Sequence, residues 1–251
     1  TGLRPGMTYR YHWATPGGEQ ATETSSFTTA PAGDPDFTFA TLGDVQTTNR
    51  FGDRWAWEAD PWEPAKAMLR HMAEHRVAFV LGLGDHAANG DSYASTRDSH
   101  LERFAAILGP AGIPFYIAWG NHDGASPQHP LRLSADMPSR FREDGMSRYT
   151  PGYGSYAFEY AGVFFICIEH YNLFADRGKW NTDSHNDVSN GWLEEQLASP
   201  AARNARFRIL AVHVPPFCER WIDGNADLRN HLVPLLEKHH VDLCLSGHMH
   251  G

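Results

Sequence analysis

The sequence predicts an α/β fold, which some schemes would class as α+β. Seven apolar runs have the length of β-strands, and they cover residues 36–43, 77–84, 113–119, 155–160, 163–169, 206–212 and 241–246. Four segments of helical character lie among them: 61–76, 94–108, 191–199 and 225–239. Strands that alternate with helices are typical of βαβ units. Ala161-Gly162 instead joins two neighbouring runs by a tight turn, so we expect 155–169 to be a hairpin and its sheet to be mixed.

The helix expected at 61–76 has the clearest local signal. Asp60 can cap it, and Pro61 suits its first turn. Its apolar residues recur at i, i+3, i+4 and i+7: Ala65, Met68, Leu69 and Met72. This stripe should pack on a sheet. His71 and His75 have the spacing of a zinc-protease motif, but they flank the stripe, and we interpret them as residues of the helix surface.

Polar side chains that can bind metals follow five of the apolar runs. In chain order they are Asp44, Asp85, Asn121 with His122, His213, and His248 with His250. Three other Gly-Asp pairs, at Asp34, Asp53 and Asp91, follow no apolar run and are interpreted as turns. Imidazoles, carboxylates and an amide oxygen collected at strand ends form the ligand set of a bound divalent metal.

The ordered set Gly-Asp, Gly-Asp, Gly-Asn-His-Asp, His and Gly-His-x-His resembles the calcineurin-like metallophosphoesterase superfamily. The resemblance covers residues 36–251. It implies a four-layer αββα sandwich, in which two mixed sheets are flanked by helices and the metals lie at the strand ends. It also implies a metal-dependent phosphoric ester hydrolase that uses two divalent or trivalent ions, with Mn, Fe and Zn left open.

The resemblance implies a role for each of these residues. Asp44 and His250 are expected to bind the first metal, and Asp85 is expected to bridge both metals. The expected ligands of the second metal are Asn121, His213 and His248. His122 matches a family histidine that faces the substrate, where it acts as a general acid or stabilises the transition state.

Two positions depart from the family pattern. Gln46 stands where much of the superfamily has the histidine of Asp-x-His, and it offers only a neutral carbonyl oxygen. It is either a weak ligand of the first metal or a polar loop residue, and we hypothesise a weaker or water-supplemented first site. Ala88 stands where the purple acid phosphatases place a tyrosine, so no purple iron charge-transfer band is expected.

Three long polar and aromatic segments, 46–62, 124–153 and 171–190, are expected to rim the metal pocket. Within them, Arg50 and Arg142 are candidates to hold phosphate oxygens, and a surface contact is the favoured alternative for each. His170 follows the run 163–169 and is either a substrate contact or a solvated loop histidine.

Residues 1–33 are predicted to be the C-terminal hairpin of a fibronectin-type-III-like module, of the kind that precedes the catalytic domain of purple acid phosphatases. Two strand-like runs, 7–14 and 21–29, flank a Gly-rich turn, and a Pro-rich linker follows them. The chain is therefore expected to be part of a larger protein in which 36–251 is the catalytic domain. An extracellular or periplasmic location is expected.

Composition excludes several partners. With 251 residues, of which 41% are hydrophobic, the chain can bury a sizeable core. Its net charge of −9 argues against a nucleic-acid backbone or an anionic membrane as the main partner. A small phosphate ester can still bind, because bound cations set the local charge. No apolar run reaches about 18 residues, so no membrane span is expected; the oligomeric state is not predicted.

The sequence thus indicates a dinuclear metal-dependent phosphoesterase. The hypothesised mechanism is in-line attack of a metal-bridging hydroxide on phosphorus, with His122 assisting the leaving group. A phosphomonoesterase is favoured over the alternatives, which are a phosphodiesterase of the same fold and a non-catalytic metal-binding scaffold.

Overall fold

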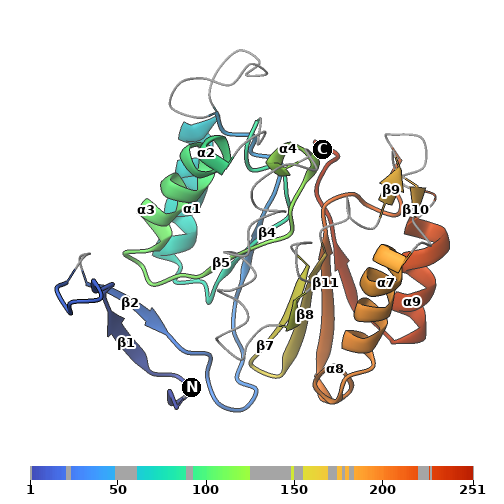
Figure 1. The fold of residues 1–251 in the computed structure, drawn as a ribbon, viewed down its shortest axis with the longest axis horizontal. Helices are drawn as coiled ribbons and strands as arrows, with labels where there is room; N and C mark the ends of the chain where they lie inside the picture. The colour runs from blue at the N-terminus through green and yellow to red at the C-terminus, as the bar shows by residue number, and fades with distance from the viewer. Residues whose placement is uncertain are drawn as a thin grey trace.

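Two β-sheets face one another, and helices cover the outer face of each (Figure 1). The computed structural model describes residues 2–20, 24–48, 61–88, 93–124, 148–149, 155–168, 174–176, 179–180, 184–219, 226 and 228–250. Helices α1 to α3 lie against one sheet, and α7 to α9 lie against the other, so the layers follow the expected order α, β, β, α.

The smaller sheet consists of β3 (Ala40–Leu42), β4 (Val80–Gly82) and β5 (Phe115–Ile117). All three described strands are parallel, in the order β3-β4-β5, so this sheet is not mixed as expected. The reason is that helical crossovers connect each strand to the next, and such crossovers join parallel strands. The strands are also shorter than predicted, although backbone bonds such as Ala78 N to Thr38 O (2.7 Å) continue the pairing beyond them.

The larger sheet is mixed, as predicted. Its order is β12-β11-β8-β7-β6, and its strands are β6 (Arg148–Tyr149), β7 (Tyr156–Tyr160), β8 (Val163–Ile168), β11 (Phe207–Val212) and β12 (Leu243–Leu245). Strands β7 and β8 form the predicted hairpin. Ala161 (φ 48°) and Gly162 (φ 74°) both have positive φ, which is the geometry of a type I′ hairpin turn.

The helices follow the predicted segments with altered ends. On the smaller sheet lie α1 (Trp62–Glu74), α2 (Tyr93–Thr96), the π-helical η1 (Arg97–Leu101) and α3 (Glu102–Leu108). On the larger sheet lie α7 (Ser184–Leu197), α8 (Pro200–Asn204), η3 (Leu228–Leu232) and α9 (Val233–Lys238). Helix α8 was not predicted, although Ser199 caps it (Ala202 N to Oγ, 3.2 Å) and Pro200 begins it. Pro234 lies in the first turn of α9, directly after η3, which is a position that proline tolerates.

Aromatic side chains fill the space between the two sheets. Phe79, in the layer of the smaller sheet, contacts Phe165 and Phe158 edge-to-face. The ring centroids are 5.2 Å apart for Phe165 and 5.7 Å apart for Phe158. All six residues of β8 are buried, because one face meets the other sheet and the opposite face meets the helices. Each such phenylalanine contributes about 1.5–3 kcal/mol through burial. This core holds the two sheets in a fixed relation.

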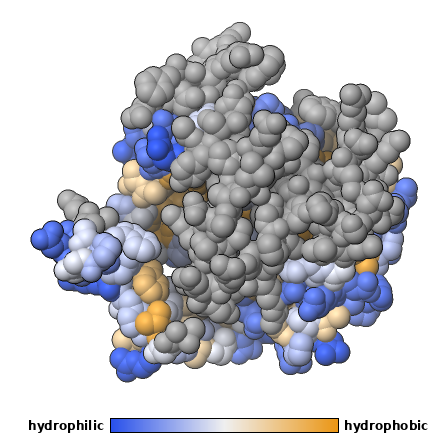
Figure 2. All heavy atoms as spheres, viewed as in Figure 1, coloured by the Kyte–Doolittle hydropathy of each residue, from blue (hydrophilic) through white to orange (hydrophobic). Residues whose placement is uncertain are grey.

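The N-terminal strands β1 (Thr8–Tyr11) and β2 (Ser25–Thr28) form the predicted hairpin, with Tyr9 stacked on Phe27. Its membership of a fibronectin-type-III-like module stays a prediction. A second small hairpin consists of β9 (Phe174–Asp176) and β10 (Lys179–Trp180). Hydrophilic residues predominate on the described surface in Figure 2, and hydrophobic residues occur there in small groups. Among the described helices, none has the length and apolar character needed to cross a membrane.

Candidate metal centre

The predicted ligands lie where strands of both sheets end. Helix α4 (Asn121–Gly124) follows β5. It lies between the two sheets, near the C-terminal segment (Figure 1). Backbone bonds run from Asp44 N to Gly84 O (2.9 Å) and from Gly247 N to His213 O (3.0 Å). The segments after β3, β4, β11 and β12 are therefore tied together in pairs, and their side chains meet between the sheets.

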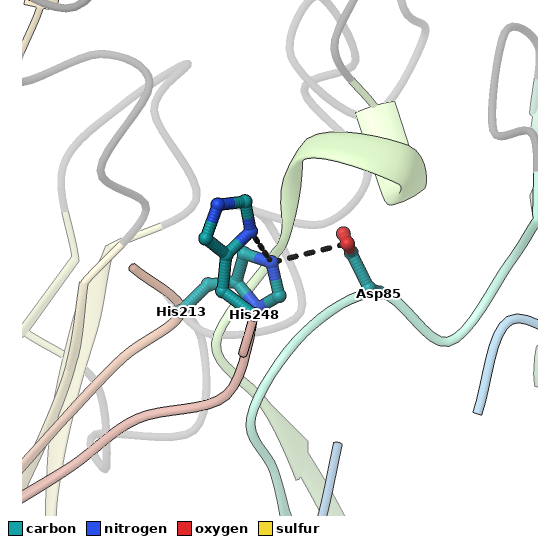
Figure 3. A group of neighbouring side chains, drawn as sticks. All are labelled: Asp85, His213 and His248. Atoms are coloured by element: carbon teal, nitrogen blue, oxygen red, sulfur yellow. Dashed lines mark hydrogen bonds and ion pairs between the residues drawn. The ribbon is translucent and has the colours of Figure 1, made fainter. Parts of the chain in front are cut away.

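His213 is the centre of this cluster. Its Nε2 atom lies 3.1 Å from Asp85 Oδ2 and 3.1 Å from His248 Nδ1 (Figure 3). The same atom lies 3.2 Å from Asn121 Oδ1. One ligand atom each from Asp85, His213 and His248 fall within 4.8 Å of one another. The structure thus brings together the residues predicted to bind the second metal, including the predicted bridging carboxylate.

A backbone carbonyl fixes the tautomer of His213. Its Nδ1–H donates to Leu83 O over 2.7 Å, so in the neutral ring the lone pair is on Nε2, the atom that faces the other ligands. Histidines that bind metals are commonly oriented in this way by a second hydrogen bond. The residue is also fully buried, so its ring has a single orientation available.

Asp44 and His250, the residues predicted to bind the first metal, also lie together. Asp44 Oδ1 is 3.7 Å from His250 Nε2, and both oxygens of Asp44 accept from His248 N at 2.9 and 2.8 Å. Gln46 belongs to the same turn, and its backbone N–H donates to Asp85 O over 2.9 Å. Whether its side-chain amide binds a metal stays a prediction.

Left-handed backbone conformations concentrate at the predicted ligands. They occur at Asp44 (φ 54°), Gln46 (φ 43°), Asp85 (φ 52°), His248 (φ 74°) and His250 (φ 47°). Such conformations are uncommon outside glycine and cost of order 1–3 kcal/mol each. Each follows a strand end, and at Asp85 and His248 the side chain after the turn lies beside His213.

Three motif glycines allow this close approach. A Cβ atom on Gly120 would lie 2.2 Å from Asp85 Oδ1, and one on Gly84 would lie 2.4 Å from His213 Nδ1. A Cβ atom on Gly247 would lie 2.6 Å from Asp44 Oδ2. The glycines of the Gly-Asp, Gly-Asn-His-Asp and Gly-His-x-His motifs are therefore required by the crowding of the ligands themselves.

Burial and charge set the protonation of the ligands. Burial would raise the pKa of Asp85, but its hydrogen bond and charge pairing with His213 outweigh burial and lower it. Burial would likewise lower the pKa of His213, but Asp85 outweighs burial and raises it. Burial and the neighbouring His213 lower the pKa of His248 to about 4, so this imidazole keeps its lone pair at neutral pH.

The arrangement fits a bound transition-metal ion at His213. Two carboxylates, three imidazoles and an amide oxygen form a mixed nitrogen and oxygen donor set, which suits Mn, Fe or Zn. Ligand atoms bound to one such ion at about 2.0–2.2 Å are about 3.0–3.5 Å from each other. The separations of 3.1 and 3.2 Å around His213 Nε2 match that spacing.

Comparison with known proteins agrees with this geometry. Residues 37–251 match the family described as calcineurin-like phosphoesterase. The chain belongs to that family.

Individual relatives of this calcineurin-like phosphoesterase are distant. A probable purple acid phosphatase 20 of Arabidopsis thaliana is 24% identical over 267 residues, which cover 99% of this chain and 52% of the relative. The chain thus spans about half the length of that curated relative.

Solved structures show the same fold. A purple acid phosphatase from yellow lupin (Lupinus luteus) seeds has a TM-score of 0.66 and 15% identity, covering 99% of this chain and 45% of its own. A dimetal phosphatase from Danio rerio has a TM-score of 0.59 and 18% identity, covering 86% of this chain and 82% of its own. GAP50, the anchor in the inner membrane complex of Plasmodium, has a TM-score of 0.54 and 20% identity, covering 84% of this chain and 65% of its own.

The candidate substrate contacts Arg50, Arg142 and His170 lie outside the described residues, so they stay predictions. Other contributors to the site were missed because they act through the backbone. The carbonyls of Leu83 and Ala88 orient histidines, and no residue type in the sequence marks a carbonyl for that role. Asp123, the last residue of the Gly-Asn-His-Asp motif, is fully buried and accepts from three backbone N–H groups.

Proposed function

We propose that this protein is a metal-dependent phosphoesterase with a dinuclear centre, and that it hydrolyses small phosphate esters. The convergence of Asp85, Asn121 and His248 on His213 Nε2 carries this proposal. A cluster with two carboxylates and three histidines has the charge and the donors that two adjacent cations need.

The chain offers a separate ligand group to each metal. Asp85, Asn121, His213 and His248 would hold one ion; Asp44 and His250, with Asp85 shared, would hold the other. Bound in this way, the ions would supply neutralisation of the ester's negative charge and a lowered pKa for water. Asp85 would be the shared ligand because its carboxylate has two oxygens, and the rest of the chemistry falls to His122.

His122 is the proposed general acid. Its Nδ1–H donates to Ala88 O over 2.7 Å, which leaves Nε2 as the ring atom that can meet a substrate. Its backbone N–H donates to Asp85 Oδ1 over 2.8 Å, so the ring is held beside the proposed bridging ligand. From there a protonated Nε2 can donate to the leaving oxygen, a role worth about 10²–10⁴-fold in rate.

A phosphomonoesterase is favoured over a phosphodiesterase. Two of the relatives found are named as purple acid phosphatases, and a third is named as a dimetal phosphatase. With the same relatives in view, we propose that residues 1–33 form the C-terminal hairpin of a fibronectin-type-III-like module and that the protein is extracellular or periplasmic.

A non-catalytic scaffold is the second candidate, because GAP50 shares this fold and is named as an anchor. Against it stands His122, which is held beside the proposed bridging ligand by hydrogen bonds to Asp85 and to the Ala88 carbonyl. A scaffold that only binds metal would need the ligands but not this histidine.

Turnover of p-nitrophenyl phosphate and bis(p-nitrophenyl) phosphate by the full-length protein tests the proposal. We expect release of p-nitrophenol with Mn, Zn or Fe present, faster from the monoester, and its loss on chelation or in the variant His213→Ala. Exposed His75, which directly follows α1, provides the control variant His75→Ala, which should keep full activity. A metal-loaded protein that releases nothing from either ester would favour the scaffold.

A further inference from the structure

Asp123 lies immediately after His122, and its carboxylate is directed to the backbone of two turns. Its Oδ1 accepts from His86 N at 2.7 Å and from Ala87 N at 2.9 Å, and its Oδ2 accepts from Gly120 N at 3.0 Å. The side chain is fully buried. Both oxygens are thus occupied by N–H donors, which explains why this acid of the Gly-Asn-His-Asp motif is not among the metal ligands.

The two turns that Asp123 joins carry the site. The turn after β4 bears Asp85 and the Ala88 carbonyl, and the turn after β5 bears Asn121 and His122. Bonds also run in the opposite direction, from His122 N to Asp85 Oδ1 (2.8 Å) and from His122 Nδ1 to Ala88 O (2.7 Å). Asp123 and His122 therefore close a ring of hydrogen bonds between the turns.

Neighbouring residues fix the outer side of the same turn. Thr47 Oγ1 donates to His86 O over 2.9 Å and approaches Ser99 O at 2.9 Å, and Ala88 N donates to Thr47 O over 3.0 Å. These contacts hold the turn after β4 against β3 and η1. Asp123 attaches this turn to the turn that carries His122 through three backbone N–H groups, beside the bonds that Asp85 and the His122 ring make.

We propose that Asp123 is a positioning residue, which clamps these two turns so that the His122 ring presents Nε2 to the leaving group. This inference rests on the proposed phosphoesterase function. A carboxylate is needed because the clamp receives N–H groups on both oxygens. Asparagine has the same shape but offers one oxygen, and its amide N–H would oppose the N–H of Gly120.

The variant Asp123→Asn distinguishes a role in positioning the His122 ring from a role in stabilising the fold alone. We expect kcat on phenyl phosphate, whose leaving group needs a proton, to fall about 10²-fold, and kcat on p-nitrophenyl phosphate to fall about 10-fold or less. KM should be unchanged on both. In a His122→Ala background, Asp123→Asn should cost little more on either ester, because residues that act through one another are not additive.

Asp98 offers a matched control. It is also a buried aspartate, and it pairs with Arg97 in η1 outside the clamp. Asp98→Asn should lower stability without making the loss depend on the leaving group. The proposal would be overturned if Asp123→Asn lowered kcat equally on the two esters. It would also be overturned if the losses in kcat from Asp123→Asn and His122→Ala were additive.

A second measurement needs no turnover and keeps this test separate from the proposed function. In metal-free wild-type protein, the ¹⁵N shifts of His122 should report protonation on Nδ1, and Asp123→Asn should shift the ring toward a tautomer mixture. An unchanged tautomer would contradict the positioning role, whereas wild-type protein inert toward all esters would contradict only the proposed function. If Asp123→Asn does not fold, Thr96→Val removes the hydroxyl that donates to Asp123 O (3.2 Å) and should give a smaller effect of the same kind.

Discussion

At the scale of single residues, the site depends on backbone groups as much as on ligands. The types and order of the ligands could be predicted, because Asp44, Asp85, His213 and the others stand in a specific pattern of motifs. Their orientation could not, because it depends on the Leu83 and Ala88 carbonyls and on left-handed turns that no residue type announces.

Gly120→Ala should remove the metals while the fold persists. Its Cβ atom would lie 2.2 Å from Asp85 Oδ1, so the proposed bridging carboxylate must move. Metal content and thermal unfolding, measured together, check this. Gly191→Ala is the control, because nothing lies within 4 Å of its Cβ position on helix α7. This variant should keep the metals, and its free energy of unfolding should rise by about 0.5–1 kcal/mol. Full metal content in Gly120→Ala would show that the crowding is not limiting.

The presence of Gln46 in place of a histidine leads us to predict that the two metal sites differ in affinity. Because an amide oxygen is a weaker ligand than imidazole for a borderline metal, titration of the metal-free protein with Zn should show one tight and one weaker site. Gln46→His should tighten the weaker site and leave the other unchanged. Two equally tight sites in the wild-type protein would contradict this hypothesis.

The Asp85–His213 pair predicts a pH dependence for the metal-free protein. The lowered pKa of Asp85 stabilises the fold above the ordinary value of 3.8, and this stabilisation is lost as pH falls through the lowered pKa. The raised pKa of His213 stabilises below the ordinary value of 6.5, and that contribution is lost as pH rises through the raised pKa. Thermal unfolding of metal-stripped protein should therefore show the largest difference between wild type and Asp85→Asn between these two values, and a difference constant with pH would contradict the pairing.

At the scale of elements, parallel strands explain how ligands distant in sequence meet. The strands themselves were predictable from apolar runs, since β8 and β11 lie inside 163–169 and 206–212. Their ends were less predictable: β3, β4 and β5 are three residues each, and β3 and β4 begin three or four residues later than their apolar runs. The π-helical turn η1 likewise had no signal in the apolar periodicity of 94–108.

Tyr156 links the larger sheet to the strand that precedes Asn121. Its hydroxyl accepts from Ile117 N (2.6 Å) and donates to Ile117 O (3.0 Å), and the ring is buried. Tyr156→Phe should lower the free energy of unfolding by about 1–3 kcal/mol, because two backbone groups lose their partner. Chemical denaturation measures this. Tyr9→Phe, which removes an exposed bond to Arg4 N, should change it by less than about 0.5 kcal/mol, and equal effects would contradict the argument.

At the scale of the whole molecule, two sheets with an aromatic core between them form a rigid support for one edge where strand ends gather. The four layers were predictable only through the motifs and the resemblance that they carry, since apolar runs alone do not reveal that the strands divide into two sheets. The parallel character of the smaller sheet differed from expectation for the same reason.

Anomalous scattering from a crystal of the protein grown with Mn or Zn tests the central claim most directly. We predict two peaks near Asp85, one within bonding distance of His213 Nε2 and the other within bonding distance of Asp44. A metal-loaded crystal with no peak near His213 would contradict the assignment of this cluster as a metal centre.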